Sequence, residues 1–159
     1  LVAFDLCTAC GACELACSFE KTEEFSKANS GIRLFTWEKT AEDIPILCYH
    51  CEDGPCIAAC GVPGAIKRDP ETNAVLIDET RCIGCKVCMA ACPYGAISID
   101  RLGKVIKCDY CGGEPKCAEV CPTNAIIWAR GDKASIILKI PFVEKLRTAS
   151  KTVSAALRS

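Results

Sequence analysis

The apolar positions of this chain fall in short runs that are separated by turn residues. Three similar segments, CGVPGAIKRD, CPYGAISID and CPTNAIIWAR, each place a turn before a short β-branched run. Runs of this kind between turn signals predict strands. We expect NAVLID (residues 73–78) and GKVIK (residues 103–107) to supply the partner strands. The pattern therefore predicts a repeated unit in which a loop and a short helix lead into a strand.

No apolar run is long enough to suggest a membrane span. The longest candidate, residues 136–143, is interrupted by Lys139 and Pro141, whereas a bilayer is crossed by ~20 apolar residues. The opening sequence LVAFDLC has none of the usual features of an export signal. We therefore predict a soluble, cytoplasmic protein without a transmembrane segment, in a compartment where thiols stay reduced.

The hydrophobic pattern changes beyond residue 132. A strand-like IILKI and a proline precede apolar residues at roughly helical spacing, with basic residues on the other faces. Such a helix would be marginally stable alone. We interpret residues 133–159 as a helical docking tail that binds a partner or a second copy of the chain. A helix folded back on its own domain and a basic helix on a membrane surface are the alternatives.

Cysteine dominates the composition, with 16 of 159 residues, so the ordinary apolar core is thinner than the hydrophobic content of 50% suggests. Every cysteine belongs to one of four quartets. The gaps are C-x2-C-x2-C-x3-C in the first and third quartets, C-x2-C-x4-C-x3-C in the second and C-x2-C-x5-C-x3-C in the fourth. In order, the quartets are Cys7, Cys10, Cys13, Cys17; Cys48, Cys51, Cys56, Cys60; Cys82, Cys85, Cys88, Cys92; and Cys108, Cys111, Cys117, Cys121.

These gaps are typical of thiolates that bind [4Fe-4S] clusters. In such sites three cysteines of a tight loop bind one cluster and the fourth binds the other cluster of a pair. Cysteines two apart in one loop cannot all form relaxed disulfides with each other. All-cysteine zinc sites usually consist of two separated C-x2-C pairs. Sixteen thiolates therefore predict four [4Fe-4S] clusters, with a zinc-binding interaction module as an alternative.

Motifs for catalysis are missing from the sequence. It contains no nucleotide-binding glycine loop, no C-x3-C-x2-C motif of radical enzymes, and a single histidine. The formal net charge of -1 gives no indication of a nucleic-acid partner. We predict that the chain moves single electrons and is not an enzyme by itself.

The quartets, together with CYHCEDGPC at residues 48–56, carry a resemblance to a known family. The chain resembles the four-cluster, double-ferredoxin iron-sulfur subunits of the dimethyl sulfoxide reductase and formate hydrogenlyase type. Its short length is most similar to the small subunits of tungsten aldehyde oxidoreductases. The sequence departs from the family pattern at two places, which puts the local geometry there in question. A proline follows Cys60 by three residues instead of one, and Cys17 is followed by Ser18.

The resemblance implies an α+β fold of two nested ferredoxin-like modules with two clusters each. The outer module would comprise about residues 1–40 and 103–132, and the inner module about residues 41–102. The implied ligands are Cys7, Cys10, Cys13 and Cys121 for cluster A; Cys108, Cys111, Cys117 and Cys17 for cluster B; Cys48, Cys51, Cys56 and Cys92 for cluster C; and Cys82, Cys85, Cys88 and Cys60 for cluster D. Other pairings of the quartets into modules stay open, because quartets one and three have identical gaps and could form a pair.

Residues beside the cysteines are candidates for tuning the clusters. We expect the imidazole of His50 to donate to a cluster sulfur or to the backbone and to make the potential of that cluster depend on pH. Lys86, Lys107 and Lys116 are candidate cations that raise cluster potentials. Gly84 either allows a close backbone approach to a cluster sulfide or serves a turn.

The resemblance also implies the partners. We expect an electron-transfer subunit that passes electrons between a large catalytic subunit and a flavin subunit or a ferredoxin. The catalytic subunit would carry tungsten or molybdenum, and aldehydes are its candidate substrates. Self-association through the tail and a free-standing polyferredoxin carrier are further hypotheses.

Overall fold

The computed structural model describes residues 1–129 together with Ile140 and Glu144. The chain divides into two units, residues 2–126 in one and Leu1 with the residues from Ile127 onward in the other. The docking tail, the boundary predicted after residue 132 and the last residues of the outer module lie outside the described residues, apart from Ile140 and Glu144.

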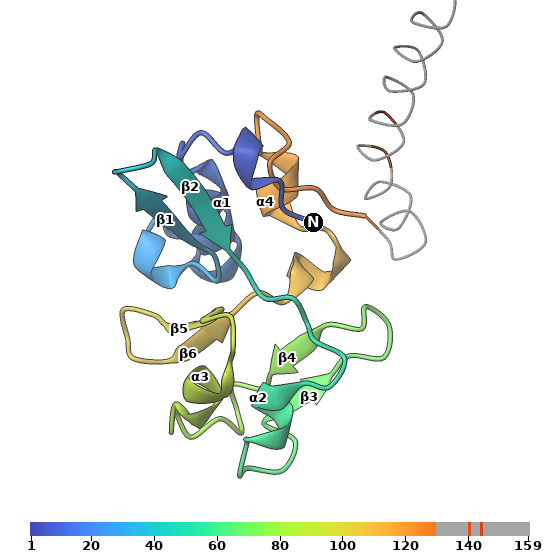
Figure 1. The fold of residues 1–159 in the computed structure, drawn as a ribbon. Coiled ribbons are helices and arrows are strands. Elements are labelled where there is room, and N and C mark those ends of the chain that lie inside the picture. Colours follow the sequence, from blue (N-terminus) through green and yellow to red (C-terminus); the bar gives the residue numbers. More distant parts are fainter. Residues whose placement is uncertain (130–139, 141–143, 145–159) are drawn as a thin grey trace, which may run out of the picture. The chain divides into compact units, whose positions relative to one another are not determined.

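The unit of residues 2–126 combines short helices and short strands, as the sequence predicts (Figure 1). The α-helices are α1 (Ala12–Thr22), α2 (Pro55–Ala58), α3 (Val87–Ala91) and α4 (Lys116–Glu119). The strands are β1 (Arg33–Trp37), β2 (Glu42–Ile46), β3 (Ile66–Arg68), β4 (Val75–Ile77), β5 (Ile97–Ile99) and β6 (Val105–Lys107). Three 3-10 turns complete it: η1 (Phe4–Leu6), η2 (Lys27–Asn29) and η3 (Tyr110–Gly113).

Three antiparallel hairpins connect successive cysteine quartets. The register places Phe35 opposite Ile44 in β1–β2, Lys67 opposite Leu76 in β3–β4, and Ser98 opposite Ile106 in β5–β6. The strands predicted in residues 73–78 and 103–107 are therefore confirmed as β4 and β6. The β1–β2 hairpin, between quartets one and two, was not predicted.

A fourth pairing links the strand positions after the last quartet to those before the first. Val2 forms an isolated antiparallel bridge with Ile126, and the N–H of Ala3 donates to the carbonyl of Ala125 over 2.8 Å. The strand or bridge residue after each quartet therefore pairs with the strand or bridge residue that precedes the next quartet, and the fourth quartet is linked to the first in this way. The four repeats form a closed ring within residues 2–126.

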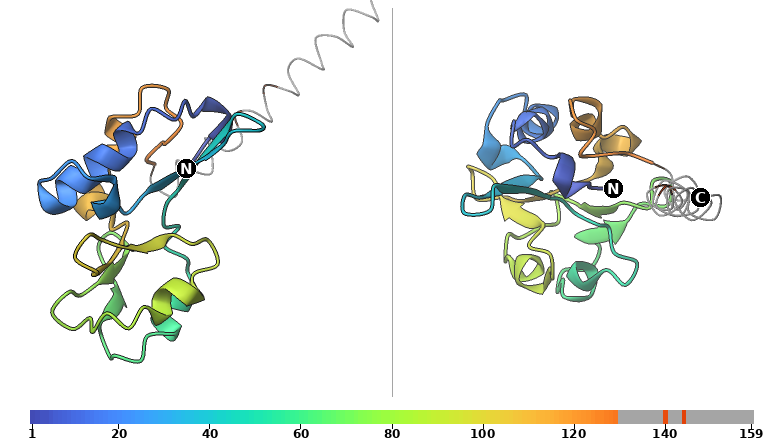
Figure 2. Two further views of the ribbon diagram at one scale, coloured as in Figure 1. Left: turned by 90° about the vertical axis from the view of Figure 1, so that its left-hand side faces the viewer. Right: turned by 45° about the horizontal axis from the view of Figure 1, so that its top comes forward.

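The helices pack in two pairs, α1 with α4 and α2 with α3. The three views show the same grouping, with α1 and α4 in one half of the unit and α2 and α3 in the other (Figures 1 and 2). The first pair joins quartets one and four, and the second joins quartets two and three. Segments far apart in the sequence are thereby brought together at both pairs.

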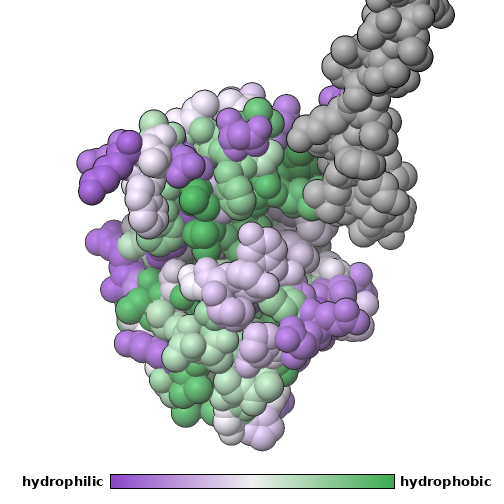
Figure 3. Space-filling view, in the orientation of Figure 1, coloured by the Kyte–Doolittle hydropathy of each residue, from purple (hydrophilic) through white to green (hydrophobic). Residues whose placement is uncertain are grey.

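Cysteines make up much of the buried core. One cluster of buried side chains combines Cys56 and Cys88 with Ile66, Val75, Ile97 and Val105. After three of the quartets an Ala-Ile pair is buried: Ala65 and Ile66, Ala96 and Ile97, Ala125 and Ile126. Apolar side chains interrupt the polar surface on the face drawn in Figure 3. Ile83 and Leu102 are 72% and 83% exposed. A thin apolar core is what the composition predicts.

Candidate metal centres

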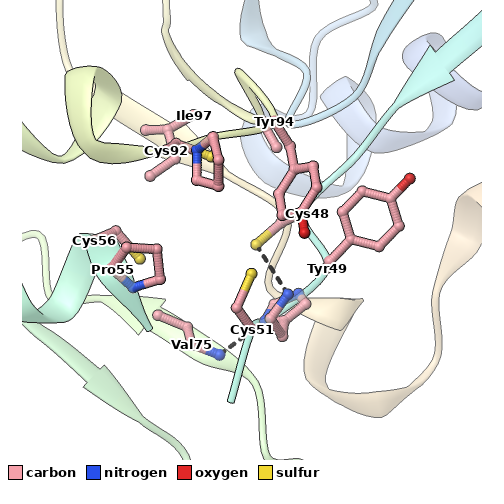
Figure 4. Close-up of a pocket in the computed structure, with 12 residues that line it drawn as sticks. Cys48, Tyr49, Cys51, Pro55, Cys56, Val75, Cys92, Tyr94 and Ile97 are labelled. Carbon is pink, nitrogen blue, oxygen red and sulfur yellow. Dashed lines mark hydrogen bonds between the residues drawn. The ribbon is translucent and has the colours of Figure 1, made fainter. Parts of the chain in front are cut away.

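Three of the four predicted cysteine sets each surround one cavity. Cys48, Cys51 and Cys56 of quartet two meet Cys92 of quartet three, and their side chains turn toward a common space (Figure 4). In the same way Cys60 of quartet two joins the first three cysteines of quartet three, and Cys121 joins the first three of quartet one. These cavities are lined by Cys60, Cys82, Cys85 and Cys88, and by Cys7, Cys10, Cys13 and Cys121.

The fourth set comes together where α1 packs on α4. Cys17 and Cys117 belong to the same buried cluster. The N–H of Gly31 donates to the Sγ of Cys17 over 3.3 Å, and a Cβ at Gly31 would lie 2.8 Å from the backbone nitrogen of Cys108, so Cys17 is also near Cys108. Each of the three cavities therefore combines cysteines of two quartets. The four ligand sets that the resemblance implies stay a prediction.

The thiols of a set surround a space and do not converge on one point. All sixteen cysteines are free thiols. Within the described part of the chain, no three cysteine, histidine or acidic side chains lie close enough to hold a single metal ion. Four thiols spaced around a small cavity suit a larger group, such as an iron-sulfur cube.

The four loops share one backbone conformation. The residue just before the second cysteine has a positive φ in every quartet: 53° at Ala9, 49° at His50, 70° at Gly84 and 61° at Tyr110. Left-handed residues in such loops turn successive N–H groups toward one side and form anion-binding concavities. A Cβ added at Gly84 meets no atom of the protein within 4 Å. The backbone conformation, and not crowding by the protein, is what favours glycine there.

Burial keeps several of these thiols protonated when no metal is bound. It raises the pKa of Cys13 to about 11 and the pKa values of Cys108 and Cys117 to about 12. A bound metal ionises its thiol ligands and releases their protons. Buried thiols around a small cavity, with backbone N–H groups nearby, fit an iron-sulfur cluster.

Comparison with known proteins agrees with this geometry. Residues 40–132 match the family model described as a 4Fe-4S dicluster domain, and residues 4–20 match one described as a 4Fe-4S binding domain. The dicluster match covers more than half of the chain. The chain belongs to the 4Fe-4S dicluster family.

Three relatives of this dicluster protein cover most of its length. The aliphatic sulfonate oxidoreductase polyferredoxin-like subunit of Pyrococcus furiosus is 38% identical, over 76% of this chain and 69% of its own. The thiosulfate reductase electron transfer subunit of Salmonella typhi is 35% identical over 82% and 74%. The B subunit of the anaerobic dimethyl sulfoxide reductase of Escherichia coli is 35% identical over 76% and 67%. The predicted likeness to the dimethyl sulfoxide reductase type is confirmed, and the likeness to tungsten aldehyde oxidoreductases stays a prediction.

The three candidate lysines of this dicluster protein have different surroundings. Lys107 is buried, with only 4% of its surface exposed. Lys86 is exposed at the N-terminus of α3, beside the cavity of quartet three. Lys116 forms ion pairs with Glu119 at 3.2 Å and Glu114 at 3.9 Å, which offset its charge. Lys107 is therefore the best placed of the three to act on a cluster.

His50 is buried beside the cavity of set C, and its two ring nitrogens have different surroundings. Its Nδ1 accepts a hydrogen bond from the N–H of Val75 over 2.8 Å, and its backbone N–H lies 3.4 Å from the Sγ of Cys48. Toward the backbone the imidazole is thus an acceptor, and its Nε2 is buried without a hydrogen-bond partner among the described residues. Donation from Nε2 to a cluster sulfur stays a prediction. Burial and the charge of Lys107 lower the pKa of His50 to about 3. The predicted dependence of the cluster potential on the titration of His50 stays a prediction.

Arg68 is a site residue that the sequence analysis missed. Its guanidinium donates to the carbonyls of His50, Cys51 and Glu52, and also to that of Asn73 across the β3–β4 turn. It therefore fastens the loop of quartet two to the adjacent hairpin. Nothing in the spacing of Arg68 distinguishes it from a surface arginine, because its partners are backbone atoms of distant residues.

We expect Arg68→Met to loosen the loop of quartet two. Hydrogen bonds from a charged group contribute about 1–3 kcal/mol each. Iron release to a chelator should therefore be faster, and hydrogen exchange at residues 50–53 should increase. Arg68→Lys should be intermediate, since an ammonium lacks the planar fork of the guanidinium. Exposed Arg101→Met is the control, and equal release from the Arg68 and Arg101 variants would show that Arg68 does not fasten the loop.

No helix among the described residues has both the length and the apolar character needed to span a bilayer.

Proposed function

We propose that this chain is the electron-transfer subunit of a multisubunit oxidoreductase and relays single electrons through four [4Fe-4S] clusters. The observation that carries the proposal is the grouping of twelve free thiols around three cavities, four to each, with Cys17 and Cys117 of the fourth set in one buried cluster. Clusters A to D would take the ligands that the resemblance implies. Each bound cluster accepts and returns one electron at a time. The chain supplies ligands, burial and local charge.

Shared elements support an order from A through B and C to D. Helix α1 carries Cys13 of set A and Cys17 of set B. Sets B and C meet where Cys108 and Cys48 pack in one buried cluster with Ala96. In another buried cluster Cys56 of set C packs with Cys88 of set D. Adjacent sets therefore touch along the whole row.

The helix pairs support two nested modules. Packing of α2 on α3 exchanges Cys60 and Cys92 between the loops of quartets two and three. Packing of α1 on α4 likewise brings Cys121 of quartet four to the cavity of quartet one. Along the sequence, α2 and α3 both lie between α1 and α4. In this proposal a complete two-cluster module is inserted in another.

Side chains around the cavities shield the clusters from water. Tyr49 and Tyr94 both line the cavity of set C, and their ring centroids are 4.7 Å apart (Figure 4). Each ring is about half exposed, so the pair covers the outer side of this cavity. Limited water access and nearby N–H groups influence the potential of a cluster.

The names of the relatives favour a large catalytic subunit as the partner. We propose that this subunit carries molybdenum or tungsten and that a flavin subunit or a ferredoxin exchanges electrons at the other end of the row. Substrates differ among the relatives, which include thiosulfate, dimethyl sulfoxide and sulfonate enzymes. The chemistry performed by the catalytic subunit therefore does not follow from the present chain.

The proposal is tested by anaerobic purification of the chain from its native source. We expect about sixteen irons per chain and co-elution with a large subunit at equal stoichiometry. Elution alone with the full iron content would identify a free polyferredoxin carrier. A zinc-containing, iron-free protein would overturn the proposal.

A further inference from the structure

Lys107 is a buried cation between two cysteine sets. It is the last residue of β6 and directly precedes Cys108, the first ligand of the proposed cluster B. Its ammonium donates to the carbonyl of Cys108 over 2.6 Å and to the carbonyl of Val75 in β4. Val75 lines the cavity of set C. The charge of Lys107 is therefore held at the junction of sets B and C.

The surroundings of Lys107 leave its charge without a matching carboxylate. It forms no ion pair with an acidic residue of the described chain. The carboxylate of Asp109, two residues away, is 2.7 Å from the ammonium of Lys21. Arg68, which donates to the carbonyls of His50 and Cys51, adds a second cation that forms no ion pair with an acidic residue of the described chain. A buried charge is costly unless an opposite charge compensates it.

The ammonium of Lys107 lies close to both adjacent sets, because the carbonyls that it binds belong to Cys108 of set B and to Val75, which lines the cavity of set C. A nearby cation favours the more negative state of a cluster. The reduced form of a cluster carries one more negative charge than the oxidised form, so it gains more from the cation.

We infer that Lys107 raises the reduction potentials of clusters B and C, so that electrons reside in the middle of the row. This inference rests on the proposed relay. Among the described residues Lys107 is the only buried lysine or arginine. Lys86, beside the cavity of set D at the end of the row, is exposed. Lys107 is not a cluster ligand, and its charge acts on the reduction potentials of clusters B and C.

The test compares cluster potentials in Lys107→Met and in the wild-type protein. Cluster-loaded protein at constant pH is reduced stepwise, and each cluster is followed by electron paramagnetic resonance. We expect two of the four potentials to fall, with the equilibrium constants for reduction lowered at least tenfold. A tenfold change corresponds to about 59 mV for one electron. Lys107→Arg should retain potentials close to the wild type, because it keeps the charge.

Two further variants keep the test decisive. Lys104→Met removes an exposed lysine that is paired with Glu79 near the other end of the same hairpin, and its four potentials should stay unchanged. Lys107→Gln removes the charge but keeps a donor for a carbonyl, and it replaces Lys107→Met if that variant does not load. Full iron content with unchanged potentials in a loaded neutral variant overturns this inference alone. Missing iron in the wild-type protein would overturn the proposed relay.

Discussion

Replacing Cys56 and Cys92 together with alanine will damage one cluster, whereas replacing Cys88 and Cys92 together will damage two. The reason is the proposed exchange of fourth cysteines between quartets. Cys56 and Cys92 line the same cavity, while Cys88 lines the next one. Without its cysteine ligands a cluster is lost or converted to a form with fewer irons. We expect the first variant to lose about four irons at most and the second about eight.

Iron analysis and electron paramagnetic resonance of anaerobically loaded protein measure this difference. The single variants Cys56→Ala, Cys88→Ala and Cys92→Ala are the controls, and each should affect one cluster. If quartet three bound its own cluster with all four cysteines, the outcome would reverse. Cys88 and Cys92 would then share a cluster, and Cys56 with Cys92 would affect two.

Gly31→Ala will lower the stability of the protein by about 1–3 kcal/mol, the usual cost of forcing extra atoms into a packed site. A Cβ at this position would lie 2.8 Å from the backbone nitrogen of Cys108 and from the carbonyl carbon of Lys107. Both contacts are with backbone, so the chain itself has to move. The N–H of Gly31 also donates to the Sγ of Cys17 over 3.3 Å. The same shift therefore disturbs the proposed site of cluster B.

Thermal unfolding of the loaded protein measures the loss, which should lower the midpoint by several degrees. Gly61→Ala is the matched control, because a Cβ there meets nothing within 4 Å and its φ is not left-handed. We expect Gly61→Ala to unfold like the wild type. Equal midpoints for the two alanine variants would show that the approach of residue 31 to residues 107 and 108 does not limit stability.

Much of the local structure follows from the sequence because it depends on neighbouring residues. The gaps within each quartet indicate a tight thiol loop. The turn and β-branched run after Cys60 and Cys92 predict β3 and β5, and both strands form with the expected partners.

Features that depend on distant partners did not follow from the sequence. Arg68, the close approach at Gly31 and the hydrogen bond from Val75 to His50 all join residues separated by more than 15 positions. The left-handed residue before each second cysteine has a sequence signature only at Gly84. The same conformation at Ala9, His50 and Tyr110 is unfavourable for a side chain and becomes evident only from the backbone.

The bridge between Val2 and Ile126 closes the cycle of pairings between the repeats. The order of the repeats along residues 2–126 therefore depends on the position at which this cycle is interrupted by the chain ends of the unit. A circular permutant joined across that bridge and opened in the β1–β2 turn would present the quartets in the order two, three, four, one. The same contacts would then give two ferredoxin modules in tandem, without any insertion. In the proposed architecture, nested and consecutive two-cluster modules are two circular permutations of one cyclic arrangement.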